Sequence, residues 1–170
     1  MSHSANQLLG TRTVTLSASS FIPKPETPFQ WFGMDRTENL YRKQDRIAGQ
    51  VRRGVRFKHH ECETSFLEGV FSRGDRALGA VLERAWRGGA RFDGWDEHFD
   101  FGRWERAFAA CGVDAEALAA PRDPDAPLPW DSVLGPVDRP FLRREWELAQ
   151  AGETTPDCRL EGPCTACAAC

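Results

Sequence analysis

The sequence predicts an α/β protein in which a terminal βαβ piece is followed by a mainly α-helical extension and a Cys-rich tail. Residues 12–19 and 55–60 alternate apolar and polar side chains with a period of two, which is typical of strands. The segment between these strands contains an apolar stripe with helical spacing. After residue 60 the spacing stays helical until the tail.

The first predicted strand, RTVTLSAS, places Val14, Leu16 and Ala18 on one face. Three prolines follow between residues 23 and 28. Each proline lacks an N–H group and favours an extended residue before it, so this segment is expected to be a stiff loop.

A helix is expected from about Thr37 to Arg53, with Gly54 ending it. Its inner stripe is Leu40, Gln44, Ile47 and Val51. The strand VRFKHH follows, and strand, helix and strand so close together predict parallel pairing with a right-handed crossover.

Four further helices are expected. The first covers about Thr64–Ser72, and Asp75, Asp100 and Asp138 are expected to cap the other three. Glycines at positions 88, 112 and 152 follow the last turns of those three helices. The predicted inward residues of the second and third helices are Leu78, Val81, Leu82, Ala85, Trp86, Trp104, Phe108 and Cys111.

The composition is that of a folded domain, with 41% hydrophobic and 28% charged residues. No apolar stretch approaches the ~20 residues that a membrane span needs, and the N-terminus lacks the features of a secretory signal. We therefore expect a cytoplasmic protein without a membrane partner.

Charge is unevenly distributed along the chain. Residues 36–58 contain eight Lys or Arg against two Asp or Glu. One interpretation is a solvated face, and the other is a basic helix that faces RNA or phosphate through Arg42, Lys43, Arg46, Arg52 and Arg53.

The strongest chemical signal is the C-terminal CRLEGPCTACAAC, which contains four cysteines in thirteen residues. Structural disulfides are rare in the cytosol, so metal ligation is favoured over bridging. Four thiolates suit an iron–sulfur cluster or tetrahedral zinc, and a tail that binds nothing is the third interpretation. The predicted metal ligands are Cys158, Cys164, Cys167 and Cys170.

Other candidates have two interpretations each. Cys62 can join His59 and His60 in a metal site, although paired histidines at a strand end are more often surface residues. His98 has carboxylates nearby and can act as a general base, although helix capping explains the same acidic residues. Cys111 is expected to be a small core residue.

Four segments together resemble one group of radical S-adenosylmethionine (SAM) proteins, whose full-length members carry an N-terminal cobalamin-binding-type domain. They are SSFIPKPETPFQW, RKQDRI, ETSFLEGVFSRGDRALGAVLERAWRGGARFDGWDEHFD and TPDCRLEGPCTACAAC, and the match runs from about residue 14 to residue 170. The resemblance implies three parts. Residues 12–60 are the last strand–loop–helix–strand portion of a partial TIM-like radical SAM barrel, residues 61–152 a helical C-terminal extension, and residues 153–170 the Cys-rich tail.

The resemblance also implies a SAM pocket at the end of the first strand, lined by Ser17, Ser19 and Ser20 and bordered by the proline loop. Phe29 and Trp31 in that loop either stack on a planar group or pin the loop by packing.

The chain lacks the CxxxCxxC signature whose thiolates hold the catalytic [4Fe–4S] cluster. The resemblance therefore implies a C-terminal fragment or split subunit that is inactive alone and needs an N-terminal radical SAM half as its partner. SAM and cobalamin are expected only in the complete enzyme, with an auxiliary iron–sulfur cluster, or zinc, in the tail. The alternatives are a zinc-stabilised binding module with a basic RNA- or phosphate-facing helix, and an orphaned fragment without function.

Overall fold

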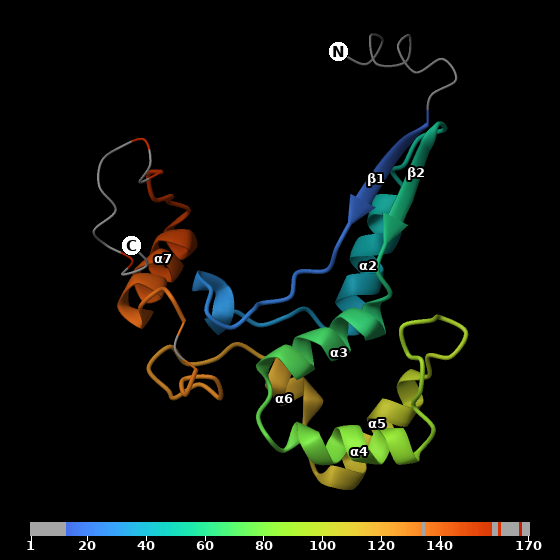
Figure 1. Cartoon of the computed structure of the whole chain (residues 1–170). Coiled ribbons are helices and arrows are strands. Elements are labelled where there is room, and N and C mark those ends of the chain that lie inside the picture. Colours follow the sequence, from blue (N-terminus) through green and yellow to red (C-terminus); the bar gives the residue numbers. More distant parts are fainter. Residues whose placement is uncertain (1–12, 134, 158–159, 161–166, 168–170) are drawn as a thin grey trace.

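The computed structural model describes residues 13–133, 135–157, 160 and 167. Within these residues the chain forms two strands, one 3₁₀ helix and six α-helices (Figure 1). The protein is therefore mixed α/β, as predicted. In chain order the elements are β1 (Val14–Ala18), η1 (Pro28–Trp31), α2 (Thr37–Ala48), β2 (Val55–His59), α3 (Cys62–Arg73), α4 (Leu78–Arg87), α5 (Phe101–Cys111), α6 (Ala115–Ala119) and α7 (Arg139–Ala151).

The predicted strand–helix–strand unit is confirmed. β1 and β2 are parallel neighbours, with Leu16 opposite Phe57, and α2 lies alongside them (Figure 1). The predicted helix end at Arg53 is wrong, because α2 stops at Ala48. Gly54 has a φ of +91° and lies in the turn that leads into β2, so this glycine serves the turn before the strand and does not close the helix.

The small sheet is largely open to solvent. Val14 and Leu16 on β1 are 46% and 43% exposed, whereas parallel strands are normally covered on both faces. Among the described residues the sheet has two strands, which places the protein in the α/β class and no further.

The larger core forms around α3, which contributes Cys62, Phe66, Leu67 and Val70. The side chains of α4 and α5 complete it, and these two helices pack against each other. The expectation that Leu82 and Trp86 point inward is wrong. They are 48% and 55% exposed, because the buried stripe of α4 is narrow and consists of Leu78, Val81 and Ala85.

The helix ends follow the predicted caps in part. Asp138 caps α7 by accepting a hydrogen bond of 2.8 Å from the Phe141 N–H. Asp100 occupies the predicted N-cap of α5, but its side chain makes no capping hydrogen bond. α4 begins at Leu78, three residues after Asp75. The short α6, capped by Asp114, is absent from the predicted elements.

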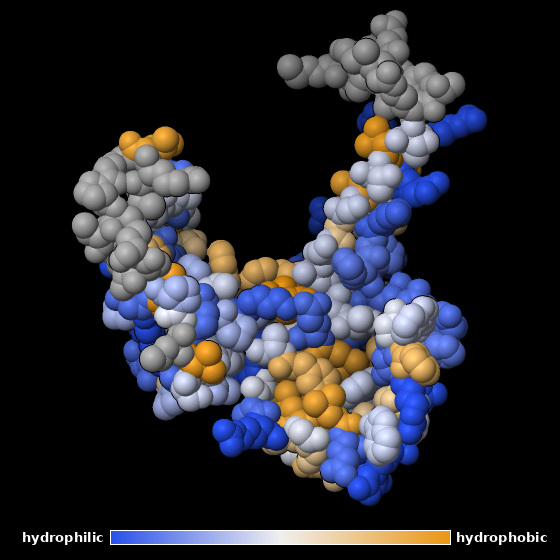
Figure 2. Space-filling model, viewed as in Figure 1, coloured by the Kyte–Doolittle hydropathy of each residue, from blue (hydrophilic) through white to orange (hydrophobic). Residues whose placement is uncertain are grey.

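A second, smaller core joins η1 to α7 and to the proline-rich connector before it. It consists of Trp31, Leu128, Trp130 and Leu142, with Trp146 packed against it. In Figure 1 α7 and the β1–β2–α2 unit rise from the same side of the helical base, at opposite ends. Figure 2 shows a mostly hydrophilic surface on α7 and on this unit, with apolar residues gathered on the base between them.

Candidate functional site

A crevice lies where β1 and β2 both end. The two strands are parallel, so their carboxyl ends meet at one edge of the sheet. The hollow measures about 320 Å³ and extends to α3. Its lining residues are Ser19, Ser20, Ile22, Lys24, His60, Ser65 and Glu68.

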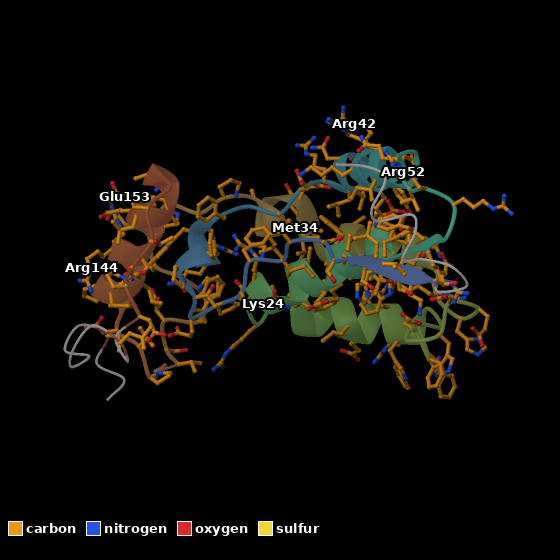
Figure 3. All side chains as sticks on the ribbon, turned by 90° about the horizontal axis from the view of Figure 1, so that it is seen from above. Lys24, Met34, Arg42, Arg52, Arg144 and Glu153 are labelled. Carbon is orange, nitrogen blue, oxygen red and sulfur yellow. The ribbon has the colours of Figure 1, made fainter. Side chains whose placement is uncertain are left out.

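Three of the six charged and polar side chains that line this crevice already have partners among the described residues. Lys24 forms an ion pair with Glu68 on α3, and Figure 3 shows Lys24 projecting from its loop. The Ser65 hydroxyl donates to the carbonyl oxygen of Glu61 at 2.9 Å. Among the described residues the hydroxyls of Ser19 and Ser20 and the ring of His60 make no hydrogen bond, so these three groups are left to contact a ligand.

The three serines of the expected SAM pocket are therefore placed differently. Ser19 and Ser20 follow β1 and line the crevice. Ser17 lies inside β1, opposite Lys58 in the register, and does not line the crevice. The structure brings together two of these residues, with His60 as a neighbour that the sequence did not assign to the pocket.

The aromatic residues of the proline loop pack on the protein itself. Trp31 is 1% exposed, and its ring lies 5.8 Å from that of Trp146 in an edge-to-face arrangement. Phe29 is 42% exposed and contacts Phe21 and Phe32. Trp31 therefore holds the loop by packing, whereas Phe29 presents its ring to solvent.

Three of the four predicted metal ligands in the tail, Cys158, Cys164 and Cys170, lie outside the described residues. Cys167 is described and is half-buried. Its carbonyl oxygen accepts a hydrogen bond of 3.3 Å from the Asp138 N–H, which places this part of the tail beside the start of α7. Within the described part of the chain, no three His, Cys, Asp or Glu side chains are grouped to hold a metal.

That finding also decides between the two interpretations of Cys62. The thiol is fully buried in the first turn of α3. Burial raises its pKa above the ordinary value of 9.0, and the negative charges of Glu63 and Glu61 raise it further. Cys62 points into the core while His59 and His60 are exposed surface residues, so the three side chains are not grouped to hold a metal.

Cys111 follows its simpler interpretation, whereas the helix-capping interpretation of the acidic residues near His98 is wrong for Asp100, whose side chain makes no capping hydrogen bond. Cys111 is half-buried and packs against the main core, as expected. His98 is exposed in the loop before α5, and its carbonyl oxygen accepts a hydrogen bond of 3.1 Å from Arg103. Its ring lies 5.9 Å from that of Phe92. No contact of the His98 ring with a carboxylate is present among the described residues.

The basic helix is exposed, as either interpretation of its charge requires. Figure 3 shows Arg42 projecting outward from α2. Arg42 and Lys43 contact Asn39 and Asp35, whereas Arg46 makes no ion pair with another described residue. Arg52 and Arg53, which were expected on the helix, lie after its end at Ala48 and also make no ion pair with another described residue. The surface is therefore basic but has no pocket of its own among the hollows found.

Sequence reasoning missed a second basic region, which lies between α4 and α5. Arg84 and Arg87 from α4 and Arg103 and Arg106 from α5 line a hollow of about 330 Å³. The available signal was a pair of arginines three residues apart in each of two consecutive helices.

Comparisons with protein-family models, with curated proteins and with solved structures found no match to this chain. No helix in the described part of the chain is long and apolar enough to cross a membrane. The class that the fold and crevice define is thus an α/β protein with a polar hollow at the carboxyl end of a parallel strand pair.

Proposed function

We propose that this chain is the C-terminal part, or a separate C-terminal subunit, of a cobalamin-associated radical SAM enzyme. In this proposal the β1–α2–β2 unit completes a barrel whose other strands belong to an N-terminal half. The observation that carries the proposal is the crevice at the carboxyl ends of two parallel strands. In parallel α/β barrels, catalysis takes place at that end of the strands.

The exposure of the sheet supports the same proposal. Val14 and Leu16 present apolar side chains to solvent, and a two-stranded sheet is marginally stable by itself. Pairing with further parallel strands would cover these side chains and satisfy the free edges of β1 and β2.

Within this proposal, Ser19 and Ser20 contribute hydroxyl groups to the SAM pocket. Ser17 belongs to β1, the strand that positions these two serines. A hydroxyl both donates and accepts hydrogen bonds, so it can contact the amino-acid end or the ribose of SAM. The Lys24–Glu68 ion pair fixes the loop beside these serines to α3.

No radical step is assigned to residues of this chain. Reductive cleavage of SAM needs the [4Fe–4S] cluster of the CxxxCxxC signature, and this sequence has no such spacing. The N-terminal half would hold that cluster, while this chain would complete the SAM pocket and supply the tail.

The tail is proposed to hold an auxiliary iron–sulfur cluster, or zinc, through Cys158, Cys164, Cys167 and Cys170. Four thiolates are a sufficient ligand set for either. The described contact between Cys167 and Asp138 gives the tail a fixed support at α7, which a ligand loop requires.

The first experiment measures 5′-deoxyadenosine under anaerobic, reducing conditions in three arms. They are this chain, a CxxxCxxC-bearing protein encoded beside it or in the same reading frame, and both together. We expect product only when both are present. Product from this chain alone, or an N-terminal half that is equally active without it, would refute the proposal.

A pair of variants tests the pocket in the active mixture. Ser19→Ala with Ser20→Ala should raise the KM for SAM, because two ligand-facing hydroxyls are removed. Ser132→Ala is the matched control, since Ser132 is exposed and remote from the crevice. Equal KM values for SAM in both variants would show that Ser19 and Ser20 do not contact SAM.

The second experiment identifies the metal in the tail. Anaerobic purification should give a brown protein with bound iron and sulfide, and Cys164→Ala with Cys167→Ala should abolish binding. Colourless protein with zinc would instead favour the structural site. Four freely titratable thiols without metal would show that the tail binds neither.

The alternative function is a zinc-stabilised module that binds RNA or phosphate through α2 and the basic segment that follows it. The observation in its favour is the exposed, unpaired charge of Arg46, Arg52 and Arg53. RNA affinity should then fall steeply as salt is raised. Zinc in the tail together with this salt dependence, and no effect on SAM cleavage in the mixed assay, would favour the module.

A further inference from the structure

The hollow between α4 and α5 is lined almost entirely by cationic side chains. Its residues are Arg84, Arg87, Gly88, Arg103, Arg106 and Ala107, and its volume is about 330 Å³. It lies outside the β1–α2–β2 unit and the tail, so it is independent of the function proposed above.

Helix geometry explains why these arginines converge. In α4 the buried stripe is Leu78, Val81 and Ala85, and Arg84 and Arg87 lie on one flank of it. Residues three apart project from the same side of a helix. The same relation holds in α5, where Arg103 and Arg106 flank a stripe that includes Trp104. Because the two helices pack against each other, the flanks face one hollow.

The charges in this hollow are not balanced by the protein. Glu83 pairs with Arg87 at 2.6 Å. A single carboxylate, Asp100, serves both Arg103 at 3.3 Å and Arg106 at 3.7 Å. Arg84 makes no ion pair with any other described residue. Two carboxylates thus face four guanidinium groups, in a chain whose net charge is −3.

Helix dipoles explain the positions of the two arginines on α4 but not the position of Arg103 on α5. Arg84 and Arg87 lie in the last turn of α4, where a positive charge is favourable. Arg103 lies near the start of α5, where the dipole opposes a cation, and the first turn of α5 contains no acidic residue. Arg103 is therefore placed against the helix dipole, and it depends on Asp100 at the N-cap of α5, which it shares with Arg106.

We propose that the α4–α5 hollow is a binding site for a polyphosphate group, either free or on a nucleoside di- or triphosphate. Phosphate oxygens match the forked donors of guanidinium groups, and each such charge-assisted pair is stronger than a neutral hydrogen bond. A bound polyphosphate would supply the negative charge that the four arginines lack. Several guanidinium groups around one hollow favour a ligand that contains several phosphates over orthophosphate.

The test is calorimetric titration of the full chain with inorganic tripolyphosphate, with ATP and with orthophosphate. We expect tripolyphosphate to bind and orthophosphate to bind much more weakly. ATP as tight as tripolyphosphate would assign the site to the phosphate chain alone, and tighter ATP would assign it to a nucleotide. Failure of tripolyphosphate to bind at millimolar concentration would overturn the proposal.

A matched pair of double variants separates this site from general charge. Arg84→Gln with Arg106→Gln should weaken tripolyphosphate binding about tenfold or more, because two charge-assisted contacts are lost. Arg42→Gln with Arg52→Gln removes the same charge from exposed α2 and the segment that follows it, and should change affinity less than about twofold. Equal losses in both double variants would show that the binding is non-specific.

Two controls complete the test. The far-ultraviolet circular dichroism of each variant should match the wild-type spectrum, since the substituted arginines are surface residues. Single-stranded RNA that binds through the hollow and is not displaced by tripolyphosphate would overturn the assignment to a small polyphosphate.

Discussion

Arg73 joins the two cores of the protein, and replacing it with methionine should destabilise the fold strongly. The side chain is fully buried. Its guanidinium donates to three backbone carbonyl oxygens, those of Gln30 at 2.9 Å, Leu118 at 3.2 Å and Ala120 at 2.8 Å. These bonds connect the end of α3 to η1 and to α6. Burial, with the nearby charge of Arg122, lowers the pKa of Arg73 to about 10, so the group remains charged at neutral pH.

The expected magnitude follows from two opposing effects. Methionine leaves three carbonyl groups without a donor, and each buried unsatisfied group costs about 1–3 kcal/mol. Methionine also removes a cation that is buried without a described acidic partner, which offsets part of that cost. The free energy of unfolding should therefore fall by about 3 kcal/mol. For a domain of this size the melting temperature should fall by about 6–12 °C.

Urea denaturation followed by circular dichroism measures this change, with Arg76→Met as the control. Arg76 is exposed, so its replacement should change stability by less than about 0.5 kcal/mol. Arg73→Lys should lie between the two, because one ammonium cannot reach three separated carbonyls as a planar fork does. A stability of Arg73→Met within about 0.5 kcal/mol of wild type would refute the reasoning.

Two further predictions concern buried contacts. Because the pKa of Cys62 is raised, the folded state keeps the thiol proton that the unfolded state loses, so stability should fall as pH rises above 9.0. Cys62→Ala should remove that part of the fall, measured as urea midpoints across the range, and an unchanged slope would contradict it. Gly33→Ala should destabilise the protein, because a Cβ there would lie 2.6 Å from the Pro121 side chain. Gly79→Ala in open space on α4 should instead stabilise it by about 0.5–1 kcal/mol, both measured by thermal unfolding.

Local patterns in the sequence were sufficient to predict both described strands and five of the six described α-helices, but neither η1 nor α6. The alternation around Leu16 and Phe57 predicted both strands, and the helix between them predicted their parallel pairing. Asp138 and Gly152 mark the ends of α7 because a cap and a left-handed glycine act on their own helix. Because these signals depend on residues that are close in sequence, they could be recognised without knowledge of the three-dimensional structure.

Which helix flank is buried depends on partners far away in the chain. Leu82 and Trp86 continue the apolar stripe of α4 in sequence, but the neighbouring helices cover only the other side of that stripe. The role of Arg73 could not be predicted from the sequence for the same reason. Its acceptors lie about 45 residues away in sequence, and backbone carbonyls have no signature in the amino-acid sequence.

The candidate crevice was predictable only in part. The strand-end position of Ser19 and Ser20 follows from the parallel pairing, since both residues come directly after β1. His60 follows β2 directly, and Glu68 lies on α3, which starts soon after β2 and lines the same hollow. The direction of α3 depends on its packing in the core, which no local pattern in the sequence specifies.

The two hydrophobic cores explain how the crevice keeps its shape although the described sheet beside it has two strands. β1 buries little apolar area, so the strand pair by itself contributes little to stability. The loop after β1 is instead fixed at three points: Lys24 to Glu68, Trp31 in the second core, and the Gln30 carbonyl to Arg73. The position of the strand ends therefore depends more on α3 than on the sheet. A partner that adds strands to the edge of β1 would find the crevice already formed, and its binding energy would not be spent on ordering the loop.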